Sequence, residues 1–118
     1  MCIRDRIGDA AIRCADLMGH LKLKPKSDIR MHQATRDLPF CNILSKLHGL
    51  LSDALEGLRR GNMSKVELAL SCFLAGCLEL AIWLEFSLKE VISQKLDYND
   101  NRPDHKPENR AKPGGKSF

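Results

Sequence analysis

The chain has 118 residues, of which 43% are hydrophobic, 29% charged and 5% aromatic. This length supports one small core and excludes two independent ones. Nineteen Lys and Arg residues against fifteen Asp and Glu residues give a formal charge of +4, which is small and scattered along the chain. The basic tail 95–118 has Tyr98 and Phe118 as its aromatic residues, too few to form a base-stacking platform. We therefore expect no nucleic-acid partner.

The cysteines and the apolar stretch predict a cytoplasmic protein. None of the five cysteines forms a Cys-x-x-Cys pair, and Cys72 and Cys77 lie inside an apolar run, as small buried side chains do in a reducing compartment. The charged N-terminus does not have the pattern of a secretory signal. Glu79 and Glu85 interrupt the apolar stretch 68–86, which favours a buried helix over a membrane span. No membrane partner is expected.

The first six residues, MCIRDR, resemble the translation of a transposase adapter used in sequencing libraries. On that interpretation residues 1–6 are an artefact and are left out of fold reasoning, and the natural chain extends upstream. The alternative is a genuine start that happens to match.

Apolar residues at helical spacing predict an all-α fold. The first helix is expected over 7–23, ending before Pro25, with one apolar face made by Ala10, Cys14, Leu17 and Leu21. Ser27 is a candidate N-cap for a short helix to Asp37, which Pro39 stops.

Three further segments complete the predicted bundle. A long helix over 40–60 ends before Gly61 and carries an apolar stripe of Leu44, Leu47, Leu51, Leu55 and Leu58. Ser64 and Glu67 have capping-box spacing and predict the start of a helix that runs to Leu84. Ser87 is expected to cap a last helix to Asn99, followed by a solvated tail.

The helix over 64–84 is apolar on nearly every face, so it needs cover on all sides. A chain of this length can barely supply that cover. We expect a missing N-terminal portion, a partner subunit in a homo-oligomer, or both.

Three segments carry a family resemblance. The last helix closes with Lys95, then Tyr98-Asn99, then Arg102-Pro103, before a Gly114-Gly115-Lys116 tail. This pattern resembles the end of MazG-like nucleoside triphosphate pyrophosphohydrolases, and residues 44–61 resemble the first catalytic helix of that family. Residues 8–21 are similar to its second catalytic helix, with Asp9 as the last carboxylate of a Glu-x-x-Asp motif whose Glu falls within residues 1–6.

A weak internal repeat accompanies the resemblance. Shifted by 63 positions, residues 77–84 repeat 14–21, with Cys14, Leu17 and Leu21 matched by identical residues and Asp16 by Glu79. The natural protein is accordingly interpreted as two related helical halves. We expect the C-terminal part of the first half over 7–38, a degenerate second half over 39–99 and a flexible tail over 100–118. The second half has lost family carboxylates, at Leu50, Ala69 and Cys72.

The resemblance implies a Mg²⁺ site and a triphosphate site. Mg²⁺ prefers a few carboxylates together with water and phosphate oxygens, and carboxylates three or four residues apart share one helix face. The candidate metal ligands are Asp9, Asp16, Asp53 and Glu56. The candidate substrate contacts are Arg13, Lys95, Asn99 and Arg102, since Arg and Lys both bind phosphate.

Each candidate has a structural alternative. Asp9, Arg13 and Asp16 share a face on which an exposed salt bridge would form, and Asp53 and Glu56 would then be part of a solvated face. The basic end of the last helix would be a solvated terminus.

The function implied by the resemblance is Mg²⁺-dependent hydrolysis of (deoxy)nucleoside triphosphates to monophosphate and pyrophosphate. We expect this activity of the intact parent protein and predict that the 118-residue chain alone is inactive. The alternative is a non-catalytic helical module for packing or dimerisation, which the loss of carboxylates in the second half favours.

Overall fold

The computed structural model describes residues 2–29, 39–103 and 106–110, and these form helices and no strands. Four long helices make up the fold: α1 (Ile3–His20), α2 (Phe40–Arg59), α3 (Met63–Trp83) and α4 (Leu88–Asn101). A single turn, α5 (Pro107–Arg110), lies within the predicted tail. The predicted all-α helical bundle is confirmed.

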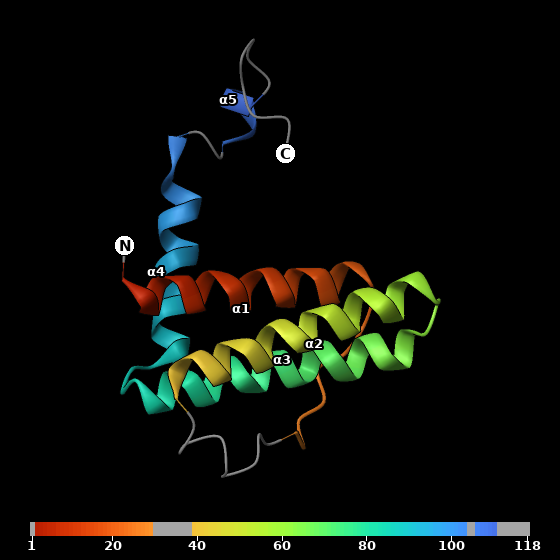
Figure 1. Cartoon of the computed structure of the whole chain (residues 1–118). Coiled ribbons are helices and arrows are strands. Elements are labelled where there is room, and N and C mark those ends of the chain that lie inside the picture. The colour runs from red at the N-terminus through yellow and green to blue at the C-terminus, as the bar shows by residue number, and fades with distance from the viewer. Residues whose placement is uncertain (1, 30–38, 104–105, 111–118) are drawn as a thin grey trace.

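α3 lies at the centre of the fold. It packs against α1, α2 and α4, and α1 in turn packs against α4 (Figure 1). α1 and α2 run in the same direction, both antiparallel to α3, while α4 crosses α1 and projects away from the other helices (Figure 1). The core gathers on α3, where Val66, Leu70, Cys77, Leu80 and Ala81 are almost inaccessible to solvent.

α3 is the one described helix long and apolar enough to cross a membrane by length and composition alone, and half of its most apolar window is buried by the other helices. Its packing against three helices agrees with the predicted buried helix. Its outer side still exposes Leu68, Leu78 and Ile82. The expectation that this helix needs more cover than the chain supplies therefore agrees with the exposed apolar side chains.

Two predicted helix starts can be compared with the structure. The capping box at Ser64 and Glu67 is wrong: α3 begins two residues earlier than expected, because the side chain of Asn62 accepts a hydrogen bond from the Lys65 amide at 3.0 Å. The predicted cap at Ser87 is confirmed, and its hydroxyl accepts from the Glu90 amide at 3.3 Å.

Of the two predicted helix ends that can be compared, the one at Gly61 is confirmed and the one at Pro25 is wrong. Gly61 follows α2 with φ of +69°, as a helix-ending glycine should. α1 ends at His20, before Pro25 is reached, because Lys22 takes the left-handed conformation. The short helix predicted from Ser27 to Asp37 falls mostly on residues 30–38, outside the described part of the chain.

The predicted apolar faces of α1 and α2 are partly wrong. On α2 only Leu47 of the leucine stripe is buried, Leu58 is half-buried, and the buried face consists of Ile43, Leu47, Ala54 and Gly57. On α1, Cys14 is buried while Leu17 is 38% exposed. The reason is that the side of each helix that packs against α3 is not the side that carries most of its large apolar residues. An edge of Leu44, Leu51 and Leu55 is left in solvent.

Candidate functional site

The two ends of the family resemblance meet where α4 crosses α1. Lys95 of α4 extends its ammonium to the Asp9 carboxylate of α1, with Nζ 3.1 Å from Oδ1. Gly8 makes the crossing close, because a Cβ built there would lie 2.7 Å from Val91 Cγ1 and 3.6 Å from Lys95 Cδ. The absence of a side chain at position 8 thus lets α4 bring its lysine to the carboxylate.

Three other candidates lie further along these two helices than the Asp9–Lys95 pair. Arg13 and Asp16 lie one and two turns after Asp9 on α1, and both are exposed. The described residues show no ion pair between Asp9 and Arg13, so the salt bridge considered as the alternative is replaced by one to α4. Asn99 lies one turn after Lys95 and is half-buried.

Arg102 is the C-cap residue of α4. Its guanidinium lies 5.8 Å from the centroid of the Tyr98 ring, and its amide donates to the Asn99 carbonyl at 3.3 Å. The three candidate substrate contacts on α4 are therefore spread along the helix. Lys95 lies where α4 crosses α1, and Arg102 lies at the solvated end.

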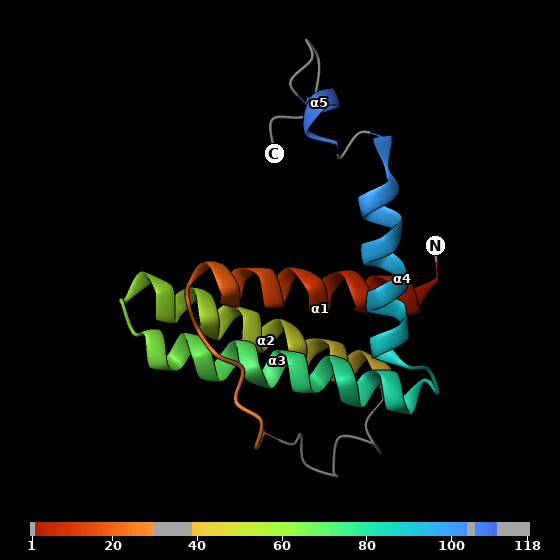
Figure 2. The same cartoon turned by 180° about the vertical axis from the view of Figure 1, so that it is seen from behind.

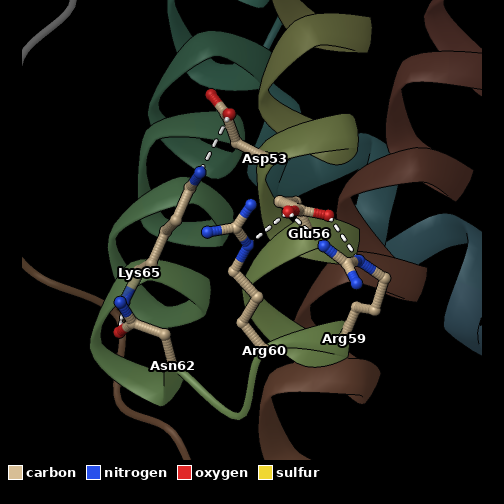
Figure 3. A network of polar contacts seen from close by, with 6 residues as sticks. All are labelled: Asp53, Glu56, Arg59, Arg60, Asn62 and Lys65. Carbon is tan, nitrogen blue, oxygen red and sulfur yellow. Dashed lines mark hydrogen bonds and ion pairs between the residues drawn. The ribbon is translucent and has the colours of Figure 1, made fainter.

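Asp53 and Glu56 belong to a separate network at the turn between α2 and α3 (Figure 3). Glu56 accepts hydrogen bonds from Arg59, at 2.8 Å, and from Arg60. These guanidinium groups lower the pKa of Glu56, Arg59 having the larger effect. Asp53 pairs with Lys65 of α3 at 3.4 Å. Both carboxylates are thus held by cations on a largely exposed surface.

The candidate ligands do not form one metal site within the described residues. No group of three or more His, Cys, Asp or Glu side chains there is close enough to hold an ion. Mg²⁺ needs several oxygen ligands at once, whereas Asp9, Asp53 and Glu56 each face a Lys or Arg instead. By themselves the described side chains therefore do not make up the implied Mg²⁺ site.

The structure also contains a groove that the sequence reasoning missed. Its volume is about 440 Å³, and it opens between the N-terminal halves of α1 and α2 over a floor of α3. Its walls are nearly all apolar, with Arg6 and His48 as the exceptions; the apolar lining includes Ile7, Phe40, Leu44, Leu51 and Phe73. The exposed leucine edge of α2 was its sequence signal, but only the position of α1 makes that edge one wall of a groove.

The cysteines behave as the sequence predicts in the core and differently outside it. Burial raises the pKa of the Cys14 thiol to about 11 and, with a further contribution from Cys14, that of Cys77 to about 12. Cys72 is half-buried and Cys41 exposed, and all five cysteines are free. Thiols whose pKa is raised in this way stay protonated and unreactive near neutral pH.

Comparison with known proteins adds no relative: no protein-family model, no curated protein and no solved structure matches this chain.

Proposed function

We propose that this chain is a helical packing module of a MazG-like nucleoside triphosphate pyrophosphohydrolase, and that the intact parent hydrolyses (deoxy)nucleoside triphosphates to monophosphate and pyrophosphate with Mg²⁺. One contrast supports the packing role for the chain itself. Asp53 and Glu56 are each neutralised by a cation, whereas α1, α2 and α3 leave large apolar side chains uncovered. Uncovered apolar surface of this extent is typical of a surface that binds another protein element.

The Asp9–Lys95 pair favours a catalytic contribution as well. It places the carboxylate that the resemblance assigns to the metal beside the lysine assigned to the triphosphate. A lysine ammonium is a mobile point charge that can leave a carboxylate for a phosphate. In the parent, Asp9 and Asp16 are the proposed metal ligands, completed by carboxylates from outside the chain, and a cytoplasmic homo-oligomer is the proposed assembly.

Pyrophosphate release tests both parts of the proposal. The 118-residue chain, incubated with Mg²⁺ and a panel of nucleoside triphosphates, is expected to release none. The parent protein is expected to release pyrophosphate from at least one nucleotide, to lose this activity on Asp9→Ala, and to keep it on Asp53→Ala, the matched surface carboxylate.

Each result has a distinct meaning. Turnover by the 118-residue chain alone would contradict the packing role, because it would place a working site within these helices. An inactive parent would contradict the enzyme family. Unchanged turnover in the parent Asp9→Ala variant would remove Asp9 from the site.

A further inference from the structure

The weak sequence repeat between α1 and α3 is a repeat of backbone structure. Both helices end in the same cap: Lys22 and Glu85, 63 positions apart, take left-handed φ values of 56° and 57°. The hydrogen bonds that close the caps match too, with the Leu23 amide donating to the Met18 carbonyl and that of Phe86 to Ala81. Two ordinary L residues rarely adopt this conformation, so its recurrence at the repeat spacing points to equivalent helices.

The two helices also bury the same face, and they run antiparallel, as two copies related by a twofold axis would (Figure 1). Most core residues of α1 have a buried counterpart on α3 at the repeat spacing, namely Ile7 with Leu70, Gly8 with Ser71, Cys14 with Cys77 and Met18 with Ala81. One hydrogen bond joins repeat positions of the two antiparallel helices. Cys14 donates from its thiol to the Leu70 carbonyl at 3.6 Å, and their counterparts, Cys77 and Ile7, both line the groove.

The segments that follow the two helices obey the same symmetry. After α3, the chain turns into α4 and crosses α1 at Gly8. After α1, the chain passes over α3 at Ser71, where the Lys26 amide donates to the serine hydroxyl at 3.1 Å (Figure 2). Since Gly8 and Ser71 are repeat counterparts, each half places its following segment on the other half.

The symmetry fails at one place. α3 has a second buried face, covered by α2, made of Val66, Ala69, Phe73, Gly76 and Leu80. The counterparts on α1 are uncovered or half-covered, namely Ile3, Arg6, Ala10, Arg13 and Leu17. Leu17 is 38% exposed, whereas Leu80 is 1% exposed. Ile3, Arg6 and Ala10 line the apolar groove, so the N-terminal part of the uncovered face of α1 forms one wall of the groove. Arg13 and Leu17 continue this face along α1 and do not line the groove.

We infer that this groove is the docking site of a helix with the pattern of α2, supplied by the segment that precedes α1 in the same protein. The proposal rests on the two-halved parent proposed above, in which α2 precedes and covers α3 and its counterpart precedes and covers α1. A helix antiparallel to both α1 and α2 would complete a four-helix bundle over the floor of α3. Ala10, Arg13 and Leu17 carry the argument independently of residues 1–6.

The charges of this face specify its occupant further. Arg6 and Arg13 stand where α3 has Ala69 and Gly76 against α2. Arg13 lies outside residues 1–6. The docking helix is therefore expected to be amphipathic, with small and branched apolar residues toward α1 and a carboxylate opposite the Arg13 guanidinium group, where the pair would be partly shielded from water.

Cysteine labelling of the 118-residue chain tests the site. In a background with Cys2, Cys41 and Cys72 changed to Ser, Leu17→Cys reports on the uncovered face of α1, and Ala15→Cys, an exposed position on another side of α1, is the matched control. The probe is a synthetic peptide with the α2 sequence, residues 39–61, in which Cys41 is also changed to Ser so that the peptide does not consume the labelling reagent. We expect it to slow labelling at position 17 several-fold, to leave position 15 unchanged, and to alter the fluorescence of Trp83, which stacks on the groove residue Phe40 at 6.1 Å.

Arg13→Cys gives a second labelling site on the same face if Leu17→Cys disturbs folding, and circular dichroism checks each variant. Equal labelling rates with and without peptide, or equal protection at positions 15 and 17, would overturn the proposal. Protection at position 17 that rises with protein concentration in the absence of peptide would overturn it too, because a second copy of the chain would then be the occupant. None of these outcomes depends on nucleotide hydrolysis.

Discussion

α1 and α3 are equivalent helices in unequal surroundings. They share a C-terminal cap, a core face and a cysteine at the same place, yet α3 is covered by α2 as well as by α1, whereas within the described residues the second neighbour of α1 is α4, which crosses it at Gly8. The two helices therefore have the same local conformation at matching positions. The helices packed around each of them decide how much apolar surface is buried there, and with it the contribution to stability. Paired substitutions at repeat counterparts can measure that contribution.

The largest expected difference comes from truncating the matched core residues. Leu70→Ala, at a fully buried position of α3, is expected to lower the free energy of unfolding by about 3–5 kcal/mol, and Ile7→Ala, beside the open groove, by about 2 kcal/mol. The reason is that solvent or side-chain movement can fill the space at position 7 more easily. Urea denaturation followed by circular dichroism measures both. Equal losses would show that α1 is as well packed as α3.

The matched cysteines predict a loss of stability at alkaline pH. Both thiols have a pKa raised from 9.0, to about 11 for Cys14 and about 12 for Cys77. Above pH 9 the unfolded chain loses these protons while the folded chain keeps them. Stability therefore falls by up to about 1.4 kcal/mol per thiol for each pH unit until the folded pKa is reached.

Alanine variants separate these thiols from the lysines and Tyr98, which titrate in the same range. Between pH 9 and pH 12 the Cys14→Ala/Cys77→Ala double variant should lose less stability than the unsubstituted 118-residue chain. For each protein the loss is measured from its free energy of unfolding at pH 8. Cys77→Ala alone should flatten the curve more than Cys14→Ala, because the Cys77 pKa is shifted further. Identical pH profiles for all variants would contradict the assignment.

The crossing of α4 over α1 predicts an effect of intermediate size. Gly8→Ala would place a methyl group 2.7 Å from Val91 Cγ1 and should cost about 1–3 kcal/mol while moving Lys95 away from Asp9. Gly19→Ala, where a Cβ would meet no atom within 4 Å, is the control and should be neutral or slightly stabilising. Thermal unfolding compares the two, and an equal effect would mean that the crossing can widen at no cost.

The smallest expected effect compares the two helix caps. Lys22→Gly and Glu85→Gly each relieve a left-handed conformation at a non-glycine residue, and each should stabilise the fold by about 0.5–1 kcal/mol. Because the two caps have the same geometry, the two gains should be similar even though the helices differ in cover. A gain at one position alone would show that the caps are not energetically equivalent.

Local patterns were enough to predict most helices, and they failed where a choice between partners was needed. The segment 40–60 was predicted within one residue of α2, since apolar spacing and Gly61 act within one turn. The same leucine pattern did not show that Leu44 and Leu51 would remain exposed. The start of α3 was missed because Ser64 and Asn62 are both good caps, and the turn after Gly61 favours Asn62.

The candidate site divides in the same way. The sequence selected Asp9 and Lys95 from opposite ends of the chain on the basis of the resemblance, but their 3.1 Å contact depends on a helix crossing that Gly8 permits. It grouped Asp53 and Glu56 with Asp9 and Asp16 by residue type. Their separation into a cation-paired network at the α2–α3 turn follows from the relative placement of the helices.

The sequence by itself determined the four long helices, the ends of α2 and the cap of α4, because apolar spacing, the Ser87 cap and the Gly61 stop act over a few residues. It did not determine the left-handed ends of α1 and α3 at Lys22 and Glu85. Tertiary structure alone decided which faces are covered, because burial requires a neighbour and the neighbours of α1 and α3 come from distant parts of the chain. The groove beside α1 is the consequence. The matching surface of α3 is covered by α2, whereas this apolar surface of α1 stays open.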